Sequence, residues 1–120
     1  MTKSEREHIE RAVALGCALC RHIGYGESPA EYHHRRTGTG AGRKAQHIDG
    51  MPLCPQHHRI GSEALHAMGR KSWEAHFGIT EIELIEQTQA LLYAPNDREQ
   101  LRRNMVARRK LENMRDMEEE

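Results

Sequence analysis

Aromatic residues and long hydrophobic runs are both scarce in this chain of 120 residues. Aromatic side chains make up 4% of the sequence, with one tryptophan and one phenylalanine, and apolar residues together make up 37%. No apolar stretch approaches the roughly 20 residues that a membrane-spanning helix needs. A single domain this polar buries only a modest core, so we expect another interaction to help hold the fold.

A secretion signal, a disulfide framework and a strong net charge are also not evident. The first residues, MTKSEREHIERAV, are charged and lack an apolar run, which predicts a cytoplasmic protein with no membrane contact. Three cysteines in a reducing compartment favour a metal site over disulfide bonds, and nine histidines point the same way. Lysine plus arginine and aspartate plus glutamate balance at 18 each, so net charge does not indicate nucleic acid as a partner.

Hydrophobic spacing predicts a small, mostly helical α+β fold. Two short strands are expected at 30–34 and 48–53, and helices at 4–15, 56–68, 72–77, from Thr80 to 92, and 97–118. Capping boxes are expected at Ser4-Glu7 and at Thr80-Glu83. The sequence therefore predicts two strands and a helix around the cysteines and histidines, flanked by further helices.

A break at Tyr93-Ala94-Pro95 divides the predicted organisation in two. Residues 1–93 form one domain, and residues 94–120 form a charged C-terminal helix. Basic and acidic residues are interspersed along this helix, which favours a solvated helix or a homodimer contact over a DNA-tracking surface.

Cysteine and histidine spacing defines two matched half-sites, Cys17-x-x-Cys20 and Cys54-x-x-His57. A two-residue spacer lets one tight turn point both ligands at one ion, and two such turns complete a tetrahedron that suits Zn²⁺. Because four protein ligands close the site, this zinc is expected to be structural. The alternative, three buried thiols without a metal, is disfavoured by two matched spacings in so short a chain. We call these four residues the staple group.

Several other histidines lie near the staple group in sequence. His33 and His34 are neighbours on a predicted strand, so they face opposite sides and do two jobs, one binding a metal and the other facing substrate. His58 follows His57 at the start of a helix, so its imidazole is expected to point away from the zinc. The isolated histidines are expected to be solvated: His8, His22 and His76.

These motifs carry a resemblance to a known superfamily. The segments Cys17-x-x-Cys20, Tyr32-His33-His34 and Asp49-Gly-Met-Pro-Leu-Cys54-Pro-Gln-His57-His58 resemble the HNH (ββα-metal) endonucleases. A longer run over about 8–92 resembles the phage-encoded recombination-enhancement (Ref-like, RecA-dependent) nucleases. That run includes Gly24 through His34, Pro52 through His58, His66, and Trp73-Glu74 before Phe77-Gly78.

The resemblance implies a zinc-stapled HNH core and a metal-dependent endonuclease that hydrolyses phosphodiester bonds in DNA, in phage or prophage recombination or repair. It implies products with 5′-phosphate and 3′-hydroxyl ends, and His34 as the general base, a task that suits an imidazole titrating near neutrality. It also implies that His33 and His58 bind a second, catalytic ion, which is Mg²⁺, Mn²⁺ or Zn²⁺. Asp49 takes the middle role of orienting His34, and His47 competes with it for that role.

The third ligand of the catalytic ion departs from the family pattern. The usual position lies one helical turn after the last histidine, where this chain has Ser62. His66 lies eight residues after His58 on roughly the same helix face and is the candidate, with phosphate contact as its alternative.

Nucleic-acid contact is predicted for a basic segment around a glycine-rich loop. Its residues are Arg35, Arg36, Arg43 and Lys44. Guanidinium groups bind phosphates without reading the nucleic-acid sequence, and glycines let a protein backbone approach the phosphates closely. An ordinary solvated loop is the alternative. The implied partners are DNA and a recombinase filament of the RecA kind.

A second class of function stays open at this point. A non-catalytic zinc-binding module for nucleic acid or protein would need the staple group but would not need His34 as a base.

Overall fold

The structure is a computed structural model that describes residues 1–39, 46–94, 97 and 103. Within these residues the fold is α+β, with one two-stranded antiparallel sheet and six helices. The strands are β1 (Glu31–His34) and β2 (Gly50–Leu53). The helices are α1 (Lys3–Ala14), α2 (Ala18–His22), α3 (Pro55–His58), α4 (Leu65–Met68), α5 (Arg70–Phe77) and α6 (Glu81–Leu92).

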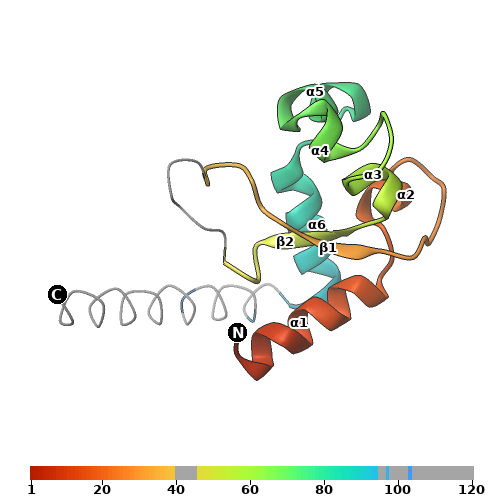
Figure 1. The fold of residues 1–120 in the computed structure, drawn as a ribbon. Helices are drawn as coiled ribbons and strands as arrows, with labels where there is room; N and C mark the ends of the chain where they lie inside the picture. The colour runs from red at the N-terminus through yellow and green to blue at the C-terminus, as the bar shows by residue number, and fades with distance from the viewer. Residues whose placement is uncertain (40–45, 95–96, 98–102, 104–120) are drawn as a thin grey trace, which may run out of the picture.

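The sheet lies at the centre of the arrangement. Helices α1, α2 and α6 all contact β2, and α1 also contacts β1. In Figure 1, α1 lies below the strands, α4 and α5 lie above them, and α2 and α3 lie side by side at one end. The short helices α2, α3 and α4, which carry several of the cysteines and histidines, therefore lie at one end of the sheet and above it.

Antiparallel pairing sets which way the two histidines of β1 point. His33 pairs with Met51 and His34 pairs with Gly50. Successive residues of a strand face opposite sides, and His33 is 2% exposed whereas His34 is exposed. The prediction that these neighbours face two ways is confirmed.

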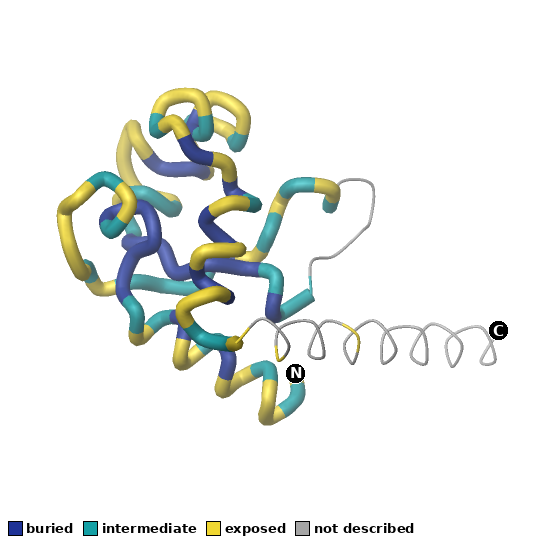
Figure 2. Tube along the Cα trace, turned by 180° about the vertical axis from the view of Figure 1, so that it is seen from behind, coloured by how far each residue is buried: buried dark blue, intermediate teal, exposed yellow. Residues whose placement is uncertain are grey.

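The hydrophobic core surrounds β2. All four residues of this strand are buried, because helices cover it. The core comprises Leu19, Met51, Leu53, Leu65, Trp73, Ile79, Leu84 and Ile85 together with Cys17, Ala18, Cys20 and Cys54. Figure 2 shows the buried stretches of the chain near the centre of the fold and exposed positions on the outer turns of the helices. Three cysteine thiols are thus part of the core itself.

Capping residues explain where the two longest described helices begin. Helix α1 starts one residue earlier than predicted, because Thr2 and Glu5 form the capping box and not Ser4 and Glu7. The box predicted for Thr80 and Glu83 is confirmed at the start of α6.

The continuous helix predicted over 56–68 is wrong. The chain forms α3, leaves the helical path at Arg59, and enters α4 only at Leu65. Gly61 lies in between with φ +95°, a conformation that glycine adopts without a Cβ penalty. The resulting turn brings His66 back towards His58, which a straight helix would hold two turns away.

Two further predictions concern membrane contact and the C-terminal helix. Within the described residues, no helix is long and apolar enough to cross a membrane. The predicted C-terminal helix over 97–118 lies outside the described residues except for residues 97 and 103, as does the homodimer contact predicted for it.

Candidate metal centres and active site

The staple group is assembled from two short turns. Cys17 is the N-cap of α2 and its Sγ accepts a hydrogen bond from the backbone N–H of Cys20. Cys54 is the N-cap of α3, and the backbone N–H of His57 is bonded to its carbonyl oxygen. One ligand atom from each of the four residues lies within 4.8 Å of the others. The structure therefore brings together all four residues of the predicted staple, and they could hold a metal ion.

Distances inside the staple group are short. Sγ of Cys20 lies 3.8 Å from Sγ of Cys54 and 3.5 Å from Nδ1 of His57. Sγ of Cys54 lies 3.2 Å from the same nitrogen. Burial raises the pKa of the Cys17 thiol to about 12, raises the pKa of Cys54, and lowers the pKa of His57.

A second group of three imidazoles lies beside the first. His33 comes from β1, His58 from α3 and His66 from α4, and one ring nitrogen of each lies within 4.8 Å of the others. Ring centroids are 4.6 Å apart for His58 and His66, 5.1 Å for His33 and His58, and 5.9 Å for His33 and His66. His33 is buried, His58 is half-buried and His66 is exposed. We call this the three-histidine group; it could hold a metal ion with one side open to solvent.

Two carboxylates contact the three-histidine group from outside. Oε2 of Glu81 lies 2.6 Å from Nε2 of His33, and Oε1 of Glu31 lies 2.7 Å from Nδ1 of His58. Glu31 also accepts a hydrogen bond from Nε of Arg59 at 2.7 Å. Sequence reasoning missed both residues. Glu81 lies 48 residues from His33 and directly after the capping Thr80, so its sequence context indicates only a helix start.

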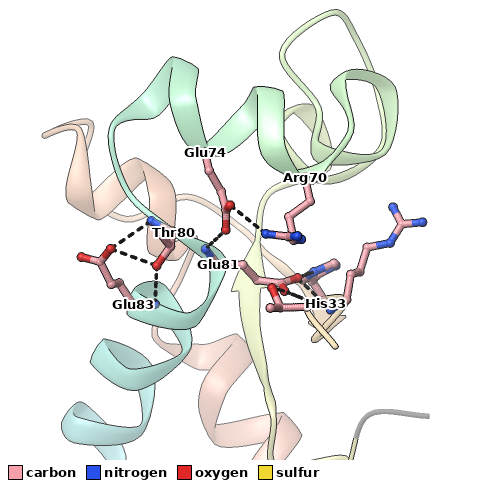
Figure 3. A network of polar contacts seen from close by, with 8 residues as sticks. His33, Arg70, Glu74, Thr80, Glu81 and Glu83 are labelled. Carbon is pink, nitrogen blue, oxygen red and sulfur yellow. Dashed lines mark hydrogen bonds and ion pairs between the residues drawn. The ribbon is translucent and has the colours of Figure 1, made fainter. Parts of the chain in front are cut away.

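Glu81 is buried, and its charge is stabilised by hydrogen bonds. Figure 3 shows its side chain extending from the start of α6 towards His33. Burial by itself would raise the pKa of Glu81, but hydrogen bonds from His33, Thr37 and the backbone of Arg36 outweigh burial and lower the pKa to about 2. The carboxylate is therefore ionised at neutral pH.

His34 lies on the other face of β1, beside His47. Nε2 of His34 is 3.1 Å from Nδ1 of His47, and Nε2 of His47 is 3.5 Å from Oε2 of Glu5 in α1. Burial, and then the neighbouring imidazoles of His47 and His33, lower the pKa of His34. The carboxylate of Asp49 instead lies 3.9 Å from the guanidinium of Arg35.

The predicted phosphate-contact residues are only partly described. Arg35 is half-buried and paired with Asp49, whereas the side chain of Arg36 is exposed and its charge acts on His66. Nε of Arg35 is buried and has no hydrogen-bond partner in the part of the chain that the structure describes. Arg43 and Lys44 lie outside the described residues.

The isolated histidines differ from one another. His22 and His76 are exposed, as predicted, but the prediction for His8 is wrong: it is 3% exposed and contacts Tyr32 and Tyr93. The reason is that α1 packs on the sheet, and His8 lies on the packed face of that helix.

Fold and site together define a small α+β protein with two adjacent groups that could each hold a metal ion. The family model described as "Recombination enhancement, RecA-dependent nuclease" matches residues 1–92, so the chain belongs to that family. The resemblance to the RecA-dependent nucleases is thereby confirmed, while membership of the HNH superfamily stays a prediction. No curated protein and no solved structure matches the chain.

Proposed function

We propose that this protein is a metal-dependent HNH endonuclease that hydrolyses phosphodiester bonds in DNA, with a structural zinc in the staple group. The observation that carries the proposal is the split of His33 and His34 on β1. His33 joins two further imidazoles in a candidate metal site, and His34 stands exposed on the other face of the strand. The family description, which names a nuclease, supports the same reaction. The order β1, β2, α3 matches the ββα arrangement that the superfamily implies.

The spacing of the staple group supports zinc as its ion. A tetrahedral Zn²⁺ with Zn–S of about 2.3 Å and Zn–N of about 2.0–2.1 Å separates two sulfurs by about 3.8 Å and a sulfur from a nitrogen by about 3.6 Å. The corresponding separations here are 3.8 Å for Cys20 and Cys54, and 3.5 Å and 3.2 Å for the pairs with His57. Thiolate and imidazole donors also fit Zn²⁺ better than Mg²⁺ or Ca²⁺.

The three-histidine group fits a single divalent ion with open coordination positions. Three protein ligands leave room for water or substrate, as catalytic sites require. When bound, the ion would supply charge stabilisation to the scissile phosphate and the leaving oxygen. Imidazole ligands suit Zn²⁺, whereas Mg²⁺ and Mn²⁺ prefer oxygen ligands. A cleavage assay with each of the three ions identifies the one that supports activity.

Contacts around His34 favour a definite protonation state for a general base. Nε2 of His47 lies 3.5 Å from the carboxylate of Glu5, and we propose that this nitrogen carries the hydrogen, so that Nδ1 of His47 accepts from Nε2 of His34 at 3.1 Å. Nδ1 of His34 then keeps its lone pair and can take a proton from water. We propose that His47, the competing candidate, takes the orienting role first predicted for Asp49.

DNA and a RecA-type filament are the proposed partners. Arg35 and Arg36 follow β1 directly, and the positive charge of Arg36 acts on His66. Together with Arg43 and Lys44 they would contact phosphates without reading sequence. The dependence on RecA in the family description motivates the filament as activator.

A nicking assay tests the proposal. Purified protein is incubated with single-stranded and duplex DNA, with Mg²⁺, Mn²⁺, Zn²⁺ or chelator, in the presence and absence of a RecA filament. We expect ion-dependent cleavage, and a loss of about 10²–10⁴-fold in His34→Ala because the general base is removed. His22→Ala, an exposed histidine on α2, is the matched control and should cleave normally.

The comparison of His47→Ala with Asp49→Ala decides the orienting residue, and we expect the larger loss for His47→Ala. Cleavage that survives His34→Ala would overturn the assignment of the base. Absence of wild-type cleavage with every ion and with the filament would favour the non-catalytic zinc module.

A further inference from the structure

Glu81 is a buried acid whose hydrogen-bonding capacity is fully used. Its side chain is 0% exposed. The carboxylate accepts from Nε2 of His33 at 2.6 Å, from the backbone N–H of Arg36 at 3.0 Å, and from the backbone N–H and hydroxyl of Thr37 at 2.8 and 2.7 Å. A carboxylate offers about four acceptor positions, so these donors satisfy it. One side chain thus ties the strand that carries both histidines to the start of α6.

The contact with Glu81 determines which nitrogen of His33 carries the proton. An ionised carboxylate can only accept, so Nε2 of His33 must donate an N–H. A neutral imidazole has one such N–H, and its other ring nitrogen keeps the lone pair that a metal needs. His33 can therefore bind an ion only through Nδ1 while this hydrogen bond persists.

The contact with Glu31 has the opposite consequence for His58. Here it is Nδ1 that lies 2.7 Å from the carboxylate, so Nδ1 donates and Nε2 keeps the lone pair. Arg59 holds the same carboxylate oxygen at 2.7 Å, which keeps Glu31 in place. Neither carboxylate belongs to the group of ligand atoms that lie within 4.8 Å of one another among the described residues. Both acids therefore lie outside the ligand set and act on it through an imidazole.

We propose that Glu81 and Glu31 are positioning residues that fix His33 and His58 in opposite tautomers, so that an ion is bound through Nδ1 of His33 and Nε2 of His58. The inference rests on the proposed function only in taking the three-histidine group as an ion site. Carboxylate partners of this kind orient histidine ligands and raise their basicity.

Glu81 is itself held by neighbours that give its orientation little freedom. Its backbone N–H donates to Oε2 of Glu74 at 2.7 Å, and Arg70 holds the other oxygen of Glu74 at 2.9 Å. These contacts are drawn in Figure 3, with the Thr80–Glu83 capping box on the opposite side of the helix start. The position of His33 is consequently set from α5 and α6, far along the chain.

Nitrogen NMR of the histidine side chains gives a direct test. Protein with a filled staple group and an empty three-histidine group is observed through long-range ¹H–¹⁵N correlations, which distinguish the two neutral tautomers. We expect His33 protonated on Nε2 and His58 protonated on Nδ1. In Glu81→Gln, where the amide can also donate, the preference at His33 should be lost.

Metal affinity provides the second readout. Titration with Co²⁺ or Zn²⁺ should show about 10–100-fold weaker binding to the three-histidine group, the second site, in Glu81→Gln and in Glu31→Gln. The ion of the staple group, the first ion, should be retained. Glu83→Gln, in the same turn of α6 and exposed, is the matched control and should bind like wild type. Because Glu31 is 30% exposed, its variant should fold even if the Glu81 variant does not.

The reverse tautomers in the wild type, or unchanged second-site affinity in both glutamine variants, would overturn this inference. If the tautomers and affinities are as expected but neither the wild type nor any variant cleaves DNA, the positioning role stands and the proposed function fails.

Discussion

Adjacent histidines of this chain lie in different surroundings, and we propose different roles for them. His57 contacts the cysteines of the staple group, whereas His58 turns to His33 and His66. His33 and His34 are separated in the same way by the alternation of β1. At the scale of single residues, imidazoles that are adjacent in sequence thus contact different groups.

His8 illustrates a histidine whose role is structural. The hydroxyl of Tyr32 donates its hydrogen to the carbonyl oxygen of His47 at 2.6 Å. The oxygen of this hydroxyl can therefore only accept from Nε2 of His8. Nδ1 of His8 then accepts from the hydroxyl of Tyr93 at 2.6 Å. This network needs the neutral imidazole, and burial followed by the charge of Arg11 lowers the pKa of His8 to about 4.

The lowered pKa of His8 predicts a stability loss in mild acid. Because the unfolded chain binds a proton near pH 6.5 and the folded chain only near pH 4, this residue destabilises the fold as pH falls through that window. The expected slope is up to roughly 1.4 kcal/mol per pH unit. Urea unfolding at pH 7, 5.5 and 4.5 should show a shallower loss in His8→Gln than in wild type. Equal losses in the two proteins would contradict the prediction, and His22→Gln serves as the exposed control.

At the scale of elements, the pairing of β1 with β2 depends on a glycine. A Cβ built on Gly50 would lie 2.5 Å from the carbonyl oxygen of His33 and 2.5 Å from the ring of Tyr32. The strand backbone at His33 cannot give way without moving this histidine.

Substitution of Gly50 should therefore affect both stability and the site. We expect Gly50→Ala to cost about 3 kcal/mol in the free energy of unfolding, at the upper end of overpacking effects, and to weaken binding of the second ion. Gly24→Ala is the comparison, because Gly24 has φ +86° and no neighbour within 4 Å of an added Cβ. It should cost about 1 kcal/mol from backbone strain alone and leave ion binding unchanged. Similar effects of the two substitutions on ion binding would refute this account.

The interruption between α3 and α4 is the element that completes the three-histidine group. A straight helix over 56–68 would carry His66 two turns beyond His58, about 12 Å along the axis at 1.5 Å per residue. The turn at Gly61 instead brings the two rings to 4.6 Å. The apolar periodicity of this stretch predicts a helix, and Gly61 is the residue in the sequence that marks where the path bends.

For the whole molecule, the two candidate metal sites are expected to differ in what they stabilise. The three cysteines of the staple group are part of the hydrophobic core, and the group joins α2 to α3, whereas His66 of the three-histidine group is exposed. Structural zinc contributes about 10–16 kcal/mol of apparent binding free energy in small zinc domains, against a typical domain stability of about 5–15 kcal/mol. Removal of the first ion should therefore unfold the protein, and removal of the second should not.

Paired substitutions test this division. Cys54→Ser should abolish cooperative thermal unfolding by circular dichroism and remove the first ion, whereas His66→Ala should keep the melting temperature within a few degrees and lose only the second ion. Chelation of wild-type protein should reproduce the Cys54→Ser result at high chelator and the His66→Ala result at low chelator. An unchanged melting temperature in Cys54→Ser would show that the staple group does not hold the fold.

Local spacing was enough to predict the staple group, the opposite facing of His33 and His34, and the capping box of Thr80, because ligand turns, strand alternation and helix caps each involve residues a few positions apart. Only the tertiary structure decided that Glu81 and Glu31 contact the three-histidine group, that His47 contacts His34, that His8 is buried, and that His66 reaches His58. The contacts of Glu81, Glu31 and His47 join residues 13 to 48 positions apart, His8 contacts Tyr93, which lies 85 positions away, and the approach of His66 follows from a bend in the chain. Packing of α6 beside the sheet brings Glu81 to His33, and packing of α1 on the sheet buries His8. One-dimensional spacing does not encode which distant acid will meet which imidazole.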